Sequence, residues 1–227
     1  MPTINSDTLA FFEELNQNNN RDWFLANKAR WDAIRRDFLV FTQALVETMT
    51  KIDPGLGDLD ASKCIYRIYR DLRFSPDKRP YKTHISCFLA TGGRKNCGVP
   101  GYYFQMGQED YGLTGNCSLG GGIFMPEPKV LEAIRQEIYY STDEFLAIME
   151  APDFKRFFGN EFWTTKKLSR VPKGYPADWP HADLLKYKDY TVNYEMQYPF
   201  TDDLFDKVIE VFRASVPLNK FIRKAMD

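Results

Sequence analysis

Positive charge is concentrated in one short segment, residues 63–82, which reads KCIYRIYRDLRFSPDKRPYK. The segment holds seven cations and two acids, a net charge of +5, whereas the whole chain has a formal net charge of -1. Arginine binds phosphate or carboxylate through a planar fork of N–H donors, and lysine acts as a compact point charge. The segment therefore predicts a site for a small anionic ligand that carries phosphate or carboxylate groups.

We expect residues 64–74 to form a β-strand, in which successive side chains point to opposite faces. Arg70 then shares its face with apolar side chains, whereas Arg67, Asp71 and Arg73 lie on the other face. A guanidinium among apolar neighbours must find a carboxylate, backbone carbonyls or a ligand anion, because an unpaired buried charge is costly. Arg70 is therefore expected to form an internal ion pair or to contact the ligand.

The turn that follows this strand adds further charge and is stiffened by two prolines, Pro76 and Pro80. Proline reduces the conformational entropy that is lost when long side chains are ordered around a ligand. The candidate ligand-binding residues are Arg67, Arg70, Asp71, Arg73, Asp77, Lys78, Tyr81, Lys82 and His84.

Two other functions fit the same residues. In the first, the Arg–Asp pairs are structural, and a protein or nucleic-acid partner uses another surface. Tyrosines beside arginines could stack bases, but residues 101–106 lack the signature of an RNA-recognition sheet, which disfavours nucleic acid. In the second, the chain is a hydrolase or a phosphoryl-transfer enzyme, whose general base would be Asp71, Asp77 or His84.

The sequence offers little to bind a cofactor or a metal, and we expect neither. The two histidines are far apart and have no partner at zinc-ligand spacing, and residues 115–122 lack the Lys-Ser/Thr of a phosphate-binding loop. The four cysteines include no C-x-x-C pair, so we expect free thiols. A nucleophilic Cys64 or Cys87 beside His84 is a weaker interpretation than inert buried cysteines.

The expected elements change in type along the chain. Helical spacing of apolar residues predicts a helix from residue 8 and one long helix over 21–53, with Asn20 as its N-cap. Short aromatic and β-branched runs predict strands at 64–74, 84–90, 102–106, 111–119 and 191–198, with an antiparallel hairpin between the third and the fourth. Ser141 to Glu144 is typical of a capping box.

Strands clustered between helical ends favour an α+β fold over a repeating βαβ fold. We expect one domain, 1–227, with a mainly antiparallel or mixed central sheet flanked by N-terminal and C-terminal helices. Its parts are helical (6–53), strand-rich (62–122), helical (126–151), irregular with one strand (152–200) and helical (202–226).

Length and composition are typical of a globular protein with a sizeable core. The chain has 227 residues, of which 44% are hydrophobic and 15% aromatic, and a chain of this length buries roughly 70% of its unfolded surface. The N-terminus lacks the pattern of a secretory signal, and no run approaches the roughly 18 apolar residues that a membrane span needs. We therefore expect a cytoplasmic protein with no membrane partner and leave its oligomeric state open.

Six stretches of the chain stand out as motifs: NNNRDWF (18–24), RDLRFSPDKRPYKTH (70–84), GYY (101–103), GGG (120–122), MPEP (125–128) and RVPKGY (170–175). Together they resemble an uncharacterised family, domain of unknown function twenty-four sixty-one, often labelled conserved hypothetical protein. The resemblance covers most of the chain and implies a single mixed α/β domain in a microbial, bacterial intracellular setting, without an established reaction. Where relatives commonly read Asp-His-Pro, this chain has Asp178-Trp179-Pro180, which disfavours histidine chemistry there.

Overall fold

A four-stranded antiparallel sheet in the order β1-β2-β3-β4 forms the centre of a single α+β domain, as expected. The computed structural model describes residues 2–73, 77–96, 98–107, 116–163, 167–197 and 203–227. The strands are β1 (His84–Leu89), β2 (Gly101–Gly107), β3 (Cys117–Ile123) and β4 (Tyr190–Met196). The expected hairpin joins β2 to β3. Most of its loop and the start of the strand expected over 111–119 fall within residues 108–115, which lie outside the described residues.

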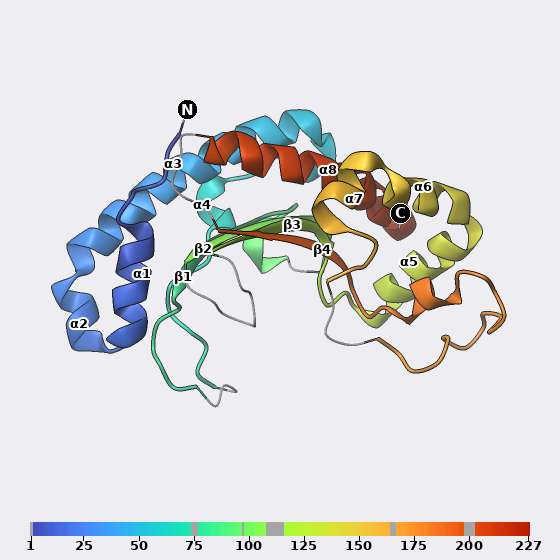
Figure 1. Ribbon diagram of the computed structural model, residues 1–227, viewed down its shortest axis with the longest axis horizontal. Coiled ribbons are helices and arrows are strands. Elements are labelled where there is room, and N and C mark those ends of the chain that lie inside the picture. The colour runs from blue at the N-terminus through green and yellow to red at the C-terminus, as the bar shows by residue number, and fades with distance from the viewer. Residues whose placement is uncertain (1, 74–76, 97, 108–115, 164–166, 198–202) are drawn as a thin grey trace.

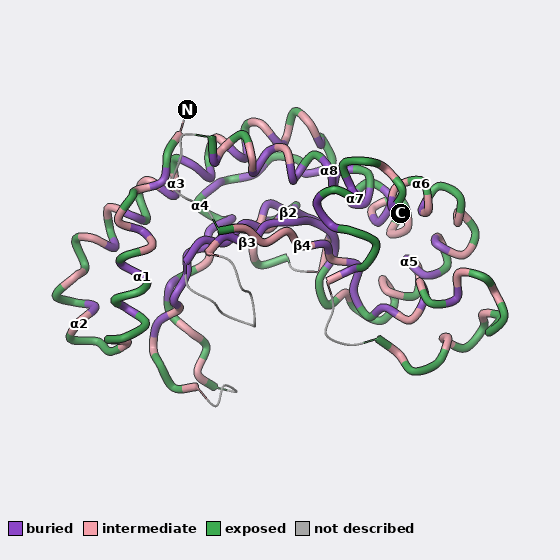
Figure 2. Tube along the Cα trace, in the orientation of Figure 1, coloured by how far each residue is buried: buried purple, intermediate pink, exposed green. Residues whose placement is uncertain are grey.

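Two long helices cover one face of this sheet (Figure 1). They are α3 (Lys28–Ile52) and α8 (Leu204–Met226). Phe104 of β2 packs against Phe38 of α3, and Tyr102 packs against Phe212 of α8. The purple traces in Figure 2 follow the strands and the inner sides of both helices, so the hydrophobic core lies between these two layers.

The remaining helices extend the molecule at both ends of the sheet (Figure 1). On the N-terminal side lie α1 (Thr8–Gln17), α2 (Arg21–Ala26) and the short α4 (Ala61–Cys64). On the other side lie α5 (Pro128–Tyr140), α6 (Thr142–Glu150) and α7 (Pro152–Phe158). The segment expected to be irregular, 152–200, therefore begins with a helix, and the short 3-10 helix Ala182–Lys186 precedes β4.

The helix expected over 21–53 is divided in two at Asn27, so that prediction is wrong in part. Asn27 has φ -103° and ψ 12°, and its side-chain amide donates to the Trp23 carbonyl at 3.0 Å, which ends α2 before α3 begins. Asn20 accepts from the Trp23 N–H at 3.0 Å and is the N-cap that the sequence predicts. The expected capping box is wrong, because Ser141 donates to Glu137 at 2.7 Å and makes no cap bond to α6.

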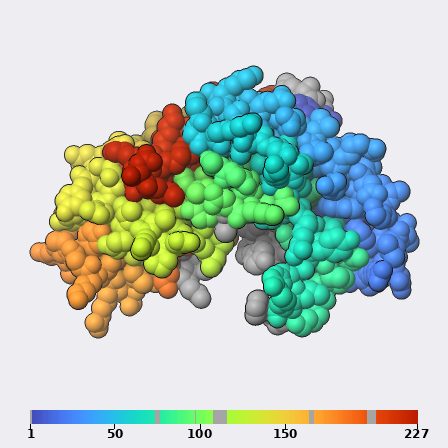
Figure 3. Space-filling view, turned by 180° about the vertical axis from the view of Figure 1, so that it is seen from behind, coloured from blue at the N-terminus to red at the C-terminus, as the bar shows by residue number. Residues whose placement is uncertain are grey.

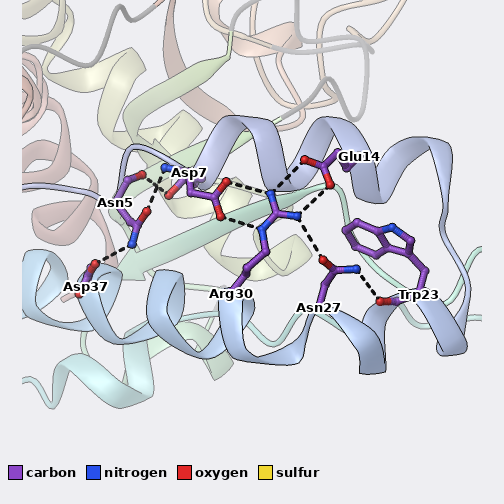
Figure 4. Close-up of polar contacts among 8 residues, drawn as sticks. Asn5, Asp7, Glu14, Trp23, Asn27, Arg30 and Asp37 are labelled. Carbon is purple, nitrogen blue, oxygen red and sulfur yellow. Dashed lines mark hydrogen bonds and ion pairs between the residues drawn. The ribbon is translucent and has the colours of Figure 1, made fainter.

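An arginine of α3 fixes α1 against α3 (Figure 4). The guanidinium of Arg30 donates to both carboxylate oxygens of Asp7, each at 2.8 Å, and to those of Glu14 at 2.8 and 3.0 Å. These bonds hold the pKa of both carboxyl groups below their usual values. These bonds hold α1, which leads into the turn at residues 18–20, against α3.

The strand expected over 64–74 is wrong for residues 64–73. Cys64 ends helix α4, and only Ile65 and Tyr69 form isolated bridges, to Cys87 and Tyr81. The alternation of faces nevertheless holds: Ile68 is buried and Arg70 half-buried, whereas Arg67, Tyr69, Asp71 and Arg73 are exposed. An extended backbone is therefore present without the continuous ladder of a regular strand. Phe74 lies outside the described residues.

Candidate functional site

The basic segment forms a projecting structure that we call the basic arm, residues 63–82. Residues 65–70 run antiparallel to residues 80–87, with backbone bonds from Arg70 N–H to Pro80 O (3.0 Å) and from Lys82 N–H to Ile68 O (2.7 Å). Figure 1 shows the arm continuing from the start of β1 and projecting away from α3 and α8. The sequence therefore places most of its cations on one small, protruding part of the fold.

Two aspartates in the arm pair with three arginines. Asp71 binds Arg73 at 2.6 Å, and both side chains are exposed. Asp77 binds Arg79 at 2.8 Å and Arg70 at 3.2 Å, and the Arg70 side chain is only 14% exposed. Arg70 thus has the internal carboxylate partner that the sequence allowed for. Hydrogen bonds from the arginines lower the pKa of Asp71 well below its usual value and that of Asp77 to about 2.

The turn between α1 and α2 holds the arm through Tyr81. The side chain of Asn19 accepts from the Tyr81 N–H and donates to the Tyr81 carbonyl, both at 3.0 Å. The buried Tyr81 ring stacks on Phe24 of α2, with centroids 4.1 Å apart, and Arg79 donates to Asn16 of α1 at 2.7 Å. Two stretches that carry the family resemblance, 18–24 and 70–84, therefore pack against each other.

Other cations of the arm lie at its surface. Arg67 is exposed, and the exposed Lys78 donates to the Leu72 carbonyl at 3.1 Å. The Lys82 ammonium lies 5.0 Å from the centre of the Tyr66 ring, which in turn contacts Tyr103 of β2 edge-on. Lys82 therefore lies where the arm meets the sheet.

His84 is enclosed at the start of β1 and is 3% exposed. Burial, together with the positive charges of Lys82 and Arg70, lowers its pKa to about 3. The imidazole is therefore neutral at pH 7 and is a weak base. The carboxylates of Asp71 and Asp77 have lowered pKa values as well, so none of the three expected bases is tuned for proton transfer near neutral pH.

The sheet face opposite the hydrophobic core carries polar side chains that our sequence interpretation did not single out. Ser86, Gln105, Ser118 and Glu195 are directly opposite one another across β1, β2, β3 and β4. Asn193 lies two residues before Glu195 on the same face. The alternation of polar and apolar residues in the strands indicates this polar face. It is clearest in TVNYEM (191–196), where the apolar positions face the core.

We call Ser86, Gln105, Ser118, Asn193 and Glu195 the polar row. In Figure 3 the underside of the molecule is hollowed between the arm, in teal, and the yellow and orange segments that follow β3. Two residues of the polar row are half-exposed, Asn193 and Glu195. The other three are at most 5% exposed. In the arm, Lys82 and Tyr66 are half-exposed. The register therefore places the polar row on the sheet face opposite α3 and α8, the side toward which the arm projects (Figure 1).

The described cysteines do not fit nucleophilic chemistry. Cys64, Cys87 and Cys117 are buried free thiols, and burial raises the pKa of Cys64 to about 11 and those of the other two further. A buried, protonated thiol is a poor nucleophile. Cys97 lies outside the described residues.

The described residues contain no group of three or more His, Cys, Asp or Glu side chains that could hold a metal ion. Within the same ranges, the helices are too short or too polar to cross a bilayer.

Comparison with known proteins gives a family and nothing beyond it. Residues 7–221 match the family described as Conserved hypothetical protein (DUF2461). The chain belongs to this family. No curated protein and no solved structure matches the chain. The resemblance to DUF2461 in the sequence is thus confirmed over almost the whole chain. The family description itself states no function.

Proposed function

We propose that the chain binds a small phosphate- or carboxylate-bearing anion on the basic arm, with Arg67, Arg73, Lys78 and Lys82 as the contacting cations. Arg70, Asp77, Tyr81 and His84 then fix the shape of the arm. Asp71 orients Arg73.

The observation that most directly supports this proposal is the excess of positive charge on the protruding basic arm. The arm has two acids against seven cations, a net charge of +5. Among the described residues, these two acids pair with Arg70, Arg73 and Arg79. Exposed ion pairs such as Asp71–Arg73 are weak because water and salt screen them, so an anion with two or three acceptor oxygens can compete for Arg73. Burial is the main cause of the lowered pKa of His84, and the nearby positive charges of Lys82 and Arg70 add to it.

Preorganisation supports the same proposal. Ordering a long side chain around a ligand costs about 0.5–1.5 kcal/mol, so a basic site binds better when its backbone is already fixed. The Asn19 bonds, the Phe24 stacking and the Asp77–Arg70 pair hold the arm from both sides. A flexible charged loop would lack these contacts.

Thermal unfolding tests the proposal directly. An anion present at 100 times its Kd stabilises the folded chain by about 2.7 kcal/mol, which for this size raises Tm by roughly 5–10 °C. We expect such a shift with inorganic phosphate, sugar phosphates or nucleotides at constant ionic strength, and a much smaller shift in Arg73→Ala and Lys82→Ala.

Lys129→Ala is the matched control, because Lys129 is exposed in the first turn of α5, away from the arm. It should respond as the parent chain does. The proposal is wrong if no anion raises Tm, or if the two arm variants respond as fully as Lys129→Ala.

A further inference from the structure

A stripe of exposed residues runs along α3 on the side opposite its buried face. The buried face includes Trp31, Phe38 and Leu45 and packs toward the core. With about 3.6 residues per turn, positions 32, 36, 40, 43, 47 and 51 of the helix fall within an arc of about 100°. We call these exposed residues the outer stripe: Asp32, Arg36, Val40, Gln43, Glu47 and Lys51.

The middle of the outer stripe borders an open groove. Leu39, Val40 and Ala44 give the groove an apolar lining on α3, and Pro2 and Asp60 lie beside them. Val40 is 58% exposed. Small-molecule sites bury about 70–90% of their ligand, so a groove this open suits the side chains of another protein surface better. Figure 3 shows the blue and cyan segment that contains α3 along the outer rim, away from the hollowed underside.

The charges of the outer stripe are arranged so that the stripe complements itself. Two antiparallel copies of α3, related by a twofold axis at the midpoint of the stripe, bring position 36 level with position 47 of the second copy. Arg36 then faces Glu47, and Asp32 is level with Lys51 at the outer ends. The two Val40 side chains lie within about 5 Å of each other along the helix axis, next to the twofold axis. Each charge therefore meets its opposite, around an apolar centre.

The charged side chains of the stripe are available for such a contact. Among the described residues, Arg36 and Lys51 have no ion-pair partner within the chain. Asp32 pairs with Lys28 at 2.7 Å, but both side chains are exposed, and such pairs are weak. Glu47 accepts from Gln43 of the same helix at 3.0 Å and keeps its negative charge for a second partner. The net charge of the chain is only -1, so two copies do not repel each other as a whole.

From this pattern we infer that α3 docks against a second copy of the same chain, antiparallel across the outer stripe, with Val40 at the centre of the contact. A polyanion or a charged membrane surface would select one sign of charge, whereas the stripe carries both signs in balance. The basic arm projects away from α3, so this contact leaves the proposed anion site open (Figure 1).

The oligomeric state of the full chain tests this inference first. Sedimentation equilibrium from about 1 to about 200 µM covers the range of a modest interface built on one helix. We expect the average mass to rise with concentration toward twice the chain mass of 26.5 kDa. A chain that stays monomeric throughout overturns the inference and leaves the groove to a small molecule or to a different protein.

Charge reversal tests the pairing itself. Arg36→Glu and Glu47→Arg each place like charges at both symmetric contacts, so each variant alone should dimerise at least about tenfold more weakly than the parent chain. Mixing the two variants should restore dimers, because the Glu introduced at position 36 faces the Arg introduced at position 47, and the native Arg36 faces the native Glu47. Lys129→Glu is the matched control, because it changes the net charge as Arg36→Glu does but lies on α5.

The results of these variants separate the proposed surface from any other. Dimers that persist unchanged in Arg36→Glu and Glu47→Arg form through a different surface and overturn the inference. A mixture that stays as monomeric as its components overturns the antiparallel pairing. Val40→Lys puts two charges at the apolar centre and should weaken dimers in the same way, and circular dichroism of each variant shows that its fold is intact.

Discussion

The contact between Asn19 and Tyr81 gives the sharpest test of how the basic arm is held. Asn19→Ala removes two hydrogen bonds of 3.0 Å and leaves the N–H and the carbonyl of Tyr81, a residue only 4% exposed, without their side-chain partners. Each lost bond costs about 1–1.5 kcal/mol when its partner stays in a partly buried place. We therefore expect a loss of about 2–3 kcal/mol in the free energy of unfolding, or roughly 5–10 °C in Tm.

The neighbouring asparagines provide matched controls for this substitution. Asn18 is exposed and donates to the Glu14 carbonyl within its own helix, so Asn18→Ala should cost less than about 0.5 kcal/mol. Asn20 caps α2, so Asn20→Ala should cost about 1 kcal/mol. Urea unfolding of the three variants should rank the losses Asn19, Asn20, Asn18.

Hydrogen exchange gives a second measurement of the same contact. In Asn19→Ala the amides of Arg70 and Lys82, which bond across the arm, should exchange faster, whereas those of β2 should exchange with little change relative to global stability. The account of the arm is refuted if Asn19→Ala loses no more stability than Asn18→Ala and leaves the arm amides as protected as before.

Three further predictions concern the rest of the fold. Arg223→Met removes the cation 2.5 Å from Asp53, a carboxylate 1% exposed, and should cost about 3–5 kcal/mol in urea unfolding; a loss below 1 kcal/mol would contradict this. Burial lowers the pKa of His84 to about 3 against about 6.5 when unfolded, so the unfolded chain binds more protons between these values. Stability linked to His84 is complete above about pH 6.5 and falls by up to about 1.4 kcal/mol per pH unit toward pH 3, a slope that His84→Gln should reduce and that equal slopes would disprove. Gly121→Ala places its Cβ 2.5 Å from the Ser215 hydroxyl oxygen and should cost about 1–3 kcal/mol, of which Ser215→Gly recovers part; no recovery would show that the contact is not the cause.

Much of the secondary structure follows from local patterns in the sequence. The buried stripe of α3, including Trp31, Phe38 and Leu45, recurs at helical spacing, and the short aromatic runs became β1, β2 and β4. The division at Asn27 was missed because it is a local change in the backbone angles of one residue within an otherwise continuous apolar pattern. Local patterns fix which residues are buried more firmly than where an element ends.

The candidate site was only partly predictable, because its parts meet across long sequence separations. The charge of the arm is plain in the sequence, and so is the need of Arg70 for a partner. The bond between Asn19 and Tyr81 joins residues 62 positions apart, and no local rule indicates it. The polar row likewise needs the register of all four strands, including β4, which follows β3 only after three helices.

The central claim is that the exposed cations of the basic arm bind an anion, and a nuclear magnetic resonance titration of the isotope-labelled chain tests it residue by residue. Adding inorganic phosphate at constant ionic strength should shift the amide signals of Arg67, Arg73, Lys78 and Lys82 in a saturable manner, with the signals of α5 and α6 unchanged. Signals of the arm that stay in place up to high phosphate concentration, or shifts confined to other surfaces, would contradict the claim.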